Sequence, residues 1–392
     1  MEMRWLTADD YDELLAMLNT VFATKYGRDV DFLAEQPKMW VKDDEHMAKH
    51  LGIFEDGVLA AVVGIYPLPA VIAGEECMFM TTGNVATLKK YEGRGYFTKL
   101  FTEIMRELEA RGAVAARLGG ARQRYGRFGF EPAGISYKFE YQETNRKKCF
   151  GDKTDLTFAR VTEADTDALA YITRIIEAKP FHVKREGGEG YRDQLLALHT
   201  KHSLPYVAIR DGAFVGYLCA CGDNVYVGAK ENGRNITELG AQDAETAYEI
   251  INAWQMRCGA TVTVSVAPHE VELIRMLGKY SESSTVASPS HFRVLAFAPL
   301  ANALMKLKAS YTALPDSDAY LEIEDYGTLH LYKHGEDVGC KLTDHTPDLT
   351  LDRHTATRLL FGTYDISTVV DAPQNLAAFL PLPLSWNTLD YT

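Results

Sequence analysis

The chain has 392 residues, 46% of them hydrophobic, and its 54 acidic and 41 basic side chains give a formal net charge of −13. This acidic balance argues against nucleic-acid binding and favours a cationic small substrate, although a merely solvated acidic surface is the alternative. The length allows two or three buried cores, and no apolar run approaches the roughly 20 residues of a membrane span.

The beginning of the chain and its cysteines bear on location. Met1 to Asp10 is too acidic, and too short in apolar residues, for a secretory signal peptide. The six cysteines are scattered without the spacing of a disulfide framework, which favours reduced thiols. We therefore expect a cytoplasmic protein.

The opening elements recur later in the chain, which indicates an internal duplication. The first set is the segment Arg4 to Asp9, a helix over Tyr11 to Phe22, and a hairpin over Leu51 to Ile65 with Asp56-Gly57 at its turn. The second set is Arg160 to Asp165, a helix over Thr166 to Ile176, and a hairpin over Tyr206 to Ala220 around Asp211-Gly212. Two related domains in tandem are expected.

A glycine turn, Gly93-Arg94-Gly95, lies between a strand-like run from Met78 to Leu88 and a helix with one apolar face that ends at Gly112. Such a turn leaves backbone N–H groups unpaired at the positive end of the helix, where a diphosphate binds. No Gly-Lys-Ser/Thr follows, and Thr98 stands where a dinucleotide fingerprint has its third glycine. A tight connection without any ligand is the alternative.

A second block follows the helix: a short strand over Ala113 to Leu118, the pair Gly119-Gly120, and then Tyr125-Gly-Arg-Phe-Gly-Phe130. From Asn84 through Phe130 the sequence resembles the acyl-CoA-binding half of the GNAT acetyltransferases. The block at Tyr125 resembles, more narrowly, the "enhanced intracellular survival" family of N-acetyltransferases. In the superfamily pattern for the diphosphate turn, Glu92 and Phe97 depart from the usual residues.

The resemblance implies a set of site residues. Acetyl-CoA is the co-substrate, with its diphosphate on the backbone of Gly93, Arg94, Gly95, Tyr96, Phe97 and Thr98 and its thioester carbonyl on Val85, Ala86 and Thr87. Tyr125 is the general acid, and the general base is the terminal carboxylate, here that of Thr392. The alternatives are a half-buried packing tyrosine and a frayed terminus. The family also implies a hexamer.

An acceptor site is expected where GNAT folds admit substrates, between the first helix and the first hairpin. Trp40 and Asp29 lie in that segment and suit an amine through cation–π and ion-pair contacts, although a tryptophan that covers the core is the alternative. No metal is expected, because the His269-Glu-Val-Glu-Leu run lacks the second histidine of a zinc motif.

The second copy lacks the chemical residues of the first. One glycine, Gly240, precedes its helix, and Met276 stands near the place of the tyrosine. We expect this copy to wall one side of the acceptor pocket. After it, a helix over Phe297 to Leu307, four short strands and a helix ending at Gly362 resemble a sterol-carrier-like module.

The sequence thus predicts an α/β (α+β) protein: two GNAT-like domains with mixed sheets, over 1–150 and 151–290, and a sterol-carrier-like αβ domain over 291–392. Its predicted function is acetyl transfer from acetyl-CoA to a primary amine of a cationic small molecule resembling an aminoglycoside or a polyamine. The alternatives are a non-catalytic CoA- or lipid-binding protein and a protein lysine acetyltransferase.

Overall fold

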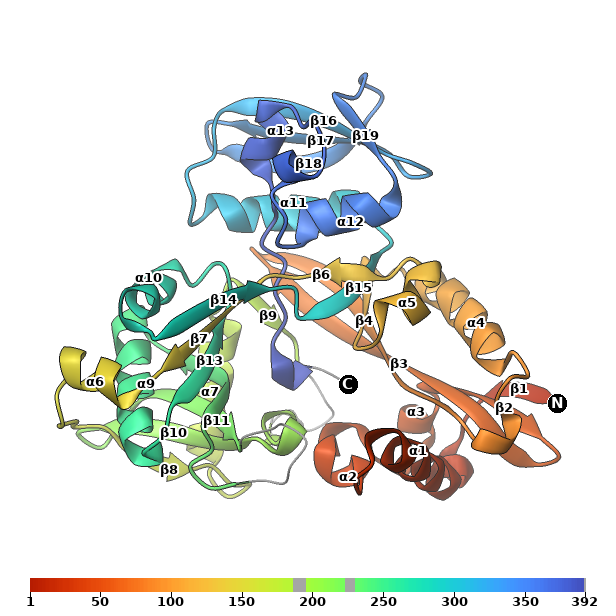
Figure 1. Cartoon of the computed structure of the whole chain (residues 1–392), viewed down its shortest axis with the longest axis horizontal. Coiled ribbons are helices and arrows are strands. Elements are labelled where there is room, and N and C mark those ends of the chain that lie inside the picture. The colour runs from red at the N-terminus through yellow and green to blue at the C-terminus, as the bar shows by residue number, and fades with distance from the viewer. Residues whose placement is uncertain (186–194, 223–229, 391–392) are drawn as a thin grey trace.

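Three sheets organise the chain in the computed structural model, which describes residues 1–185, 195–222 and 230–390. Two of the sheets lie side by side, and the third lies above them in Figure 1. Among the described helices, none has the length and apolarity needed to cross a bilayer.

The first sheet has the order β1-β2-β3-β4-β5-β15-β6, and β9 pairs with the last three residues of β3. Its strands are β1 (Glu2–Trp5), β2 (His50–Glu55), β3 (Val58–Ile72), β4 (Glu75–Thr87), β5 (Ala115–Leu118), β6 (Glu131–Ala133), β9 (Phe181–Val183) and β15 (Ser290–Val294). The associated helices are α1 (Tyr11–Tyr26), α2 (Phe32–Glu35), α3 (Asp44–Met47), α4 (Tyr96–Ala110) and α5 (Arg122–Tyr125). The predicted first hairpin and the helix after the glycine turn are both confirmed.

The second sheet has the order β14-β7-β13-β12-β11-β10-β8. Its strands are β7 (Ser136–Tyr141), β8 (Thr157–Arg160), β10 (Leu204–Arg210), β11 (Ala213–Cys221), β12 (Asn235–Ala241), β13 (Val262–Val266) and β14 (Ser283–Ala287). The helices around it are α6 (Glu143–Cys149), α7 (Thr166–Glu177), α9 (Ala244–Cys258) and α10 (Val271–Tyr280). From the opposite edge this order is β8-β10-β11-β12-β13-β7-β14, which corresponds strand by strand to β1-β2-β3-β4-β5-β15-β6 of the first sheet. This correspondence agrees with the duplication inferred from the sequence.

The two sheets exchange one strand each. β7 follows β6 in the chain but pairs with β13 and β14 of the second sheet, whereas β15 follows β14 but lies between β5 and β6 of the first. The hydrogen-bonded ladders therefore cross the two predicted domain boundaries, at residues 150 and 290. Because each exchanged strand fills an interior position of its sheet, neither sheet is complete without the other half of the chain.

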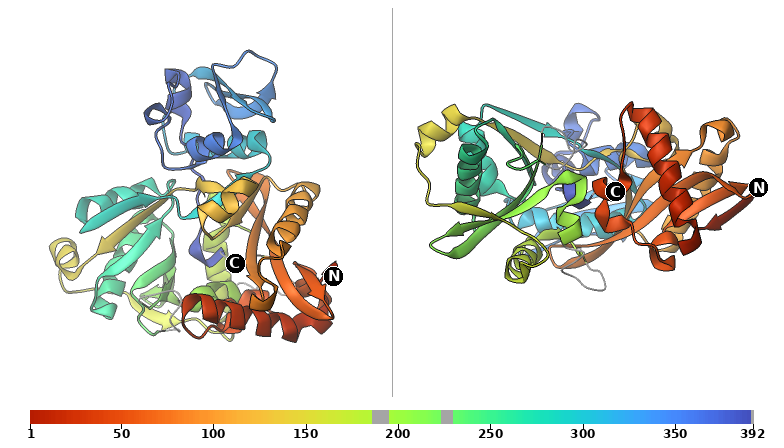
Figure 2. Two further views of the ribbon diagram at one scale, coloured as in Figure 1. Left: turned by 45° about the vertical axis from the view of Figure 1, so that its right-hand side comes forward. Right: turned by 90° about the horizontal axis from the view of Figure 1, so that it is seen from below.

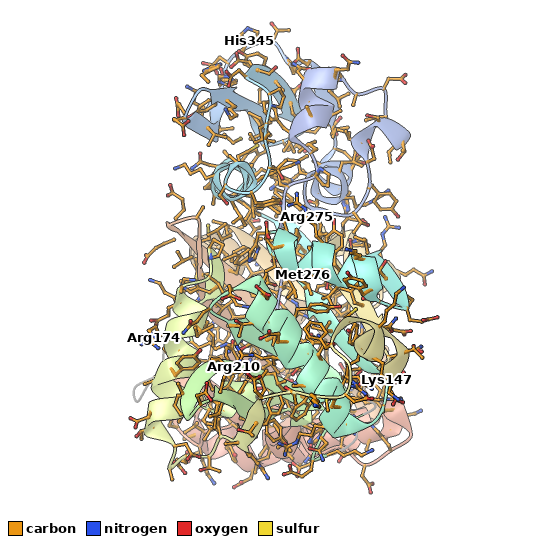
Figure 3. The ribbon with its side chains drawn as sticks, turned by 90° about the vertical axis from the view of Figure 1, so that its left-hand side faces the viewer. Lys147, Arg174, Arg210, Arg275, Met276 and His345 are labelled. Atoms are coloured by element: carbon orange, nitrogen blue, oxygen red, sulfur yellow. The ribbon has the colours of Figure 1, made fainter. Side chains whose placement is uncertain are left out.

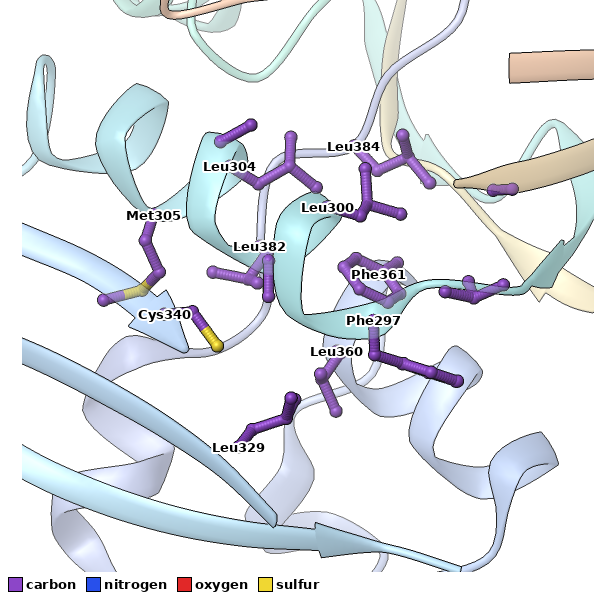
Figure 4. Packing of buried hydrophobic residues seen from close by; sticks show 14 of the residues in the cluster. Phe297, Leu300, Leu304, Met305, Leu329, Cys340, Leu360, Phe361, Leu382 and Leu384 are labelled. Atoms are coloured by element: carbon purple, nitrogen blue, oxygen red, sulfur yellow. The ribbon is translucent and has the colours of Figure 1, made fainter. Parts of the chain in front are cut away.

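The third unit is a four-stranded sheet, β18-β17-β16-β19, packed on helices. Its elements are α11 (Phe297–Ala309), β16 (Ser317–Ile323), β17 (Gly327–His334), β18 (Asp337–Thr343), β19 (Leu349–Leu351), α12 (Arg353–Phe361) and α13 (Gln374–Phe379). Figure 4 shows the aromatic and aliphatic side chains of α11 and α12 gathered between the helices and the sheet, where Phe297 and Phe361 are fully buried. This core continues into the first sheet through Phe79.

After α13 the chain runs back towards the other two units. This C-terminal tail, Leu380 to Asp390, passes between the first and second sheets in Figures 1 and 2. Trp386 packs on Phe79 of β4, with ring centroids 4.9 Å apart. The tail therefore touches the face of β4 that is turned towards the second sheet.

Candidate functional site

The site begins where two central strands separate. β4 and β5 run parallel and pair from Phe79 with Ala115 to Thr82 with Leu118, where the pairing ends. Beyond this point Asn84 and Val85 lie opposite the single residue Val63 of β3, which is a β-bulge. The edge of β4 over residues 83–87 that faces away from β3 therefore has no strand partner in the described sheet, and its N–H groups are available to a ligand.

A buried hydrogen-bonded group holds this bulge. Asn84 adopts a left-handed conformation with φ of 52°, and its side-chain amide donates to the Tyr66 hydroxyl over 2.5 Å. The Tyr66 hydroxyl in turn lies 2.8 Å from His50 Nε2. Gly64 leaves room for this ring, because a Cβ there would lie 2.2 Å from Tyr66 Oη. Buried side chains of the core thus hold the β-bulge at the point where β4 leaves β5.

The glycine turn leads from β4 into α4. Gly93 and Gly95 have φ of 78° and 76°, a conformation that suits glycine, and both are exposed. Gly95 is the N-cap of α4; it provides no side-chain cap, and the first turn of the helix carries no acidic residue. The first N–H groups of this 15-residue helix are therefore bonded neither by an N-cap side chain nor by an acidic residue of the first turn, which leaves them available to an anion.

Side chains around the turn are held by local contacts. Arg94 donates to Glu55 over 2.5 Å, and the Tyr96 hydroxyl bonds the same carboxylate. Arg127 donates to Thr98 Oγ1 over 3.0 Å, and the Arg124 guanidinium lies 4.3 Å from the Phe97 ring centroid. Two arginines from the segment after β5 thus stand beside the start of α4, where they favour bound phosphate.

Tyr125 lies against the start of the same helix. Its ring is 6% exposed and packs on Phe97 and Phe101, with centroid distances of 5.8 and 5.2 Å. A Cβ on Gly120 would lie only 2.4 Å from Tyr125 Cε2, so the glycine before α5 is what lets this ring approach the backbone. Burial raises the pKa of Tyr125, which keeps the phenol protonated and able to donate a proton.

Tyr125 and the start of α4 are in direct contact through Phe97, the second residue of that helix. Val85 of β4 packs against the same hydrophobic core as Phe97 and Tyr125. The arrangement combines uncapped helix N–H groups, a strand edge with available donors and a protonated phenol. Such a set can bind a diphosphate, polarise a carbonyl and protonate a leaving group.

The predicted acceptor residues are Trp40 and Asp29. Trp40 is 5% exposed and stacks on His50 with ring centroids 5.7 Å apart, and its buried indole N–H has no hydrogen-bond partner among the described residues. Asp29 is exposed, and its carbonyl accepts a hydrogen bond from Arg28. Trp40 belongs to a different hydrophobic cluster from that of Tyr125. Thr392 lies outside the described residues, so its role and those of Trp40 and Asp29 stay predictions.

Several buried charged groups near the tail were not predicted from the sequence. Lys38 donates to the Leu389 carbonyl over 2.5 Å, and burial lowers its pKa to about 7. Burial also lowers the pKa of Lys201, to about 8, and Arg117 of β5 disfavours the charge on both lysines. These cations come from three distant segments, so no local pattern in the sequence could have indicated them.

The second sheet differs from the first at the corresponding helix start. The N-cap of α9 is Asp243, whose carboxylate accepts a hydrogen bond from Thr246 N over 2.7 Å, so an acidic group already occupies this helix start. On α10, Met276 and Arg275 stand at the outer side of the molecule in Figure 3. Among the described residues, no group of three His, Cys, Asp or Glu side chains is placed to hold a metal.

Comparison with known proteins agrees with this geometry. Residues 2–133 match the family described as "Acetyltransferase (GNAT) domain". No curated protein matches the sequence significantly.

Solved structures resemble the whole chain. A probable N-acyltransferase from Enterococcus faecalis V583 has a TM-score of 0.69 at 14% identity, with 100% of this chain and 99% of that one covered. Eis1 from Mycobacterium abscessus has a TM-score of 0.65 at 16% identity, with 99% and 98% covered. A GCN5-related N-acetyltransferase from Kribbella flavida has a TM-score of 0.65 at 15% identity, with both chains fully covered. At such identities these likenesses establish the fold, which is that of Eis-like GNAT proteins.

Proposed function

We propose that this chain, an N-acetyltransferase by its GNAT domain over residues 2–133, transfers acetyl from acetyl-CoA directly to a primary amine of a cationic small molecule. An aminoglycoside or a polyamine represents the intended class of acceptor. The observation that carries the proposal is the contact between Tyr125 and Phe97, which places a buried phenol beside the uncapped start of α4. A diphosphate on that helix start brings the rest of the coenzyme along β4 towards the phenol.

The reaction needs three contributions from the protein. Within the Val85–Thr87 segment, the N–H groups of Val85 and Thr87 point to the open edge of β4, whereas Ala86 pairs with Val62 of β3. These open N–H groups stabilise the oxyanion that forms when the amine nitrogen attacks the thioester carbonyl carbon. As the new C–N bond forms and the C–S bond breaks, the Tyr125 hydroxyl gives its proton to the departing thiolate. A base accepts the proton that the amine nitrogen loses.

For that base we propose the carboxyl group of Thr392. Asp390, two residues earlier, is buried, and Lys38 of the first domain holds the Leu389 carbonyl. A carboxylate near this position accepts the ammonium proton directly or through one water.

A thiol-release assay over a panel of amines tests the function. Acetyl-CoA is incubated with aminoglycosides, polyamines and lysine peptides, and with amino acids as small amines that also carry a carboxylate. Release of thiol with a small amine supports the proposal. Release with peptides only indicates a protein lysine acetyltransferase, and no release with any amine indicates a non-catalytic CoA- or lipid-binding protein.

The glycine turn gives a separate prediction for coenzyme binding. Replacing Gly95 by alanine puts a Cβ on a residue with φ of 76°, at a cost of about 1–2 kcal/mol, and shifts the helix start. We expect about tenfold weaker binding of acetyl-CoA by calorimetry. Gly112→Ala is the matched control, since Gly112 has φ of 67° at the other end of α4. Equal affinities for both variants would show that the turn does not bind the coenzyme.

A further inference from the structure

The second sheet repeats the strand separation of the first, but a different occupant lies against it. β12 and β13 run parallel and pair only at Asn235 with Thr263 and Ile236 with Val264, after which they diverge. A cavity of about 140 Å³ lies at this divergence, with the C-terminal tail forming part of its wall. Its lining includes Thr237, Glu238 and Leu239 of β12, Val264, Ser265 and Val266 of β13, and Ser385, Trp386 and Asp390 of the tail.

The end of the tail is embedded rather than laid on the surface. Leu389 is fully buried in a cluster with Ile172 of α7 and with Val207 and Tyr217 of the second sheet. Its N–H bonds the side chain of Asn387 over 2.8 Å. An element held in this way is a docked part of the fold, unlike a free terminus.

Buried charges hold the residue that follows. Arg185 Nε donates to Asp390 Oδ1 over 2.8 Å, and its other nitrogens donate to the carboxylate of Glu238 at 3.1 and 2.5 Å. The Tyr217 hydroxyl adds a hydrogen bond to Glu238 over 2.9 Å. The Arg185 and Asp390 side chains are only 7% and 6% exposed. Such a group fixes the position of each member, because the loss of one charged side chain leaves a buried charge without its partner.

The first domain holds the same segment from the other side. Lys38 Nζ donates to the Leu389 carbonyl, so Leu389 and Asp390 are fixed by side chains of both GNAT-like halves. Two residues span at most about 7 Å, so a fixed Asp390 limits where the carboxyl group of Thr392 can reach.

We propose that the second domain serves as a socket for the tail, and that Arg185, Glu238 and Lys38 are positioning residues for acetyl transfer in the first domain. The inference rests on the proposed function. In the first domain the diverging strands face a helix start that is open to a diphosphate, whereas in the second domain Asp243 caps that helix and the tail lies against the strands. The C-terminal tail of the chain thus occupies, in the second domain, the place that corresponds to the coenzyme site of the first.

Asp390→Asn tests the socket, because it removes the charge that Arg185 holds and leaves the shape unchanged. We expect kcat to fall at least tenfold and KM for acetyl-CoA to stay within twofold, since the coenzyme site is untouched. The acid limb of the pH–rate profile is also expected to shift, which a purely structural role would not cause. Asp10→Asn is the control: Asp10 forms a bidentate pair with Arg4 at 2.7 and 2.8 Å and is also buried.

A second pair of variants covers the case in which Asp390→Asn does not fold. Lys38→Met removes the hydrogen bond to Leu389 and the amine that interacts with Asp390, and it is expected to lower kcat. Lys38→Arg keeps both a donor and a charge and is expected to recover most of the rate. If kcat of Asp390→Asn or Lys38→Met falls no further than that of Asp10→Asn, the socket plays no part in the reaction. The failure of the proposed function itself is seen separately, as a wild-type chain that releases no thiol with any amine.

Discussion

Replacing Tyr125 by phenylalanine is expected to lower kcat by about 100- to 10,000-fold, the usual contribution of a positioned general acid. The phenol packs against Phe97 in the first turn of α4, and burial raises its pKa, so it is protonated throughout the neutral range. Phenylalanine keeps the contacts with Phe97 and Phe101 and removes only the hydroxyl. The affinity for acetyl-CoA should therefore change little.

The control for this variant is Tyr171→Phe. Tyr171 lies on α7 in the second domain and is 6% exposed, as Tyr125 is, so each replacement removes one hydroxyl from an equally buried ring. Steady-state thiol release should separate the two variants by at least about a hundredfold in kcat. If the two rates are equal, or if Tyr125→Phe acts on KM alone, Tyr125 is a packing residue.

Extending the chain by three residues beyond Thr392 is expected to lower kcat by a similar factor, about 100-fold or more. The extension turns the proposed base into a neutral amide carbonyl and moves the carboxylate away. Leu389 and Asp390 should remain docked, because their contacts with Lys38 and Arg185 involve neither of the last two residues.

An extension of the same three residues before Met1 is the matched control, since Met1 is exposed at the outer edge of the first sheet. Both proteins are compared by thiol release and by melting temperature. A C-terminal extension that retains the wild-type rate would exclude the carboxylate of Thr392 as the base. A loss of rate with an unchanged melting temperature is the result that the mechanism requires.

The sequence predicted what is encoded locally. The Gly93 to Thr98 turn follows from two glycines and an apolar repeat on α4, and the hairpins follow from their Asp-Gly turns, since all of these patterns lie within a few residues. Tyr125 was identified through a motif, and its contact with Phe97 could not be read from spacing alone. Asp243 caps α9 in the second copy, and the expectation that this copy carries no chemistry stays a prediction.

The pairing of strands that are far apart in the sequence could not be predicted. β7 pairs with β13 and β15 pairs with β5, and no residue of β7 or β15 indicates that each strand joins the sheet of the other half. The same holds for Arg185, Glu238 and Asp390, which are far apart in the chain and are brought together only by the docked tail. Trp40 was chosen for its residue type, and its place in a hydrophobic cluster with Phe32 and Tyr66 could not be read from the sequence; its role stays a prediction.

The most direct test of the account compares acetyl-CoA with acetyl-pantetheine, which carries the same thioester without the diphosphate and the phosphorylated adenosine attached to it. Each hydrogen bond to a charged group contributes about 1.5–3 kcal/mol, so two or more bonds from the N–H groups of residues 93–98 predict at least about 100-fold weaker binding of acetyl-pantetheine. Calorimetric titration of the wild-type chain measures both affinities. Equal affinities would contradict the account, because the glycine turn would then contribute nothing to holding the coenzyme.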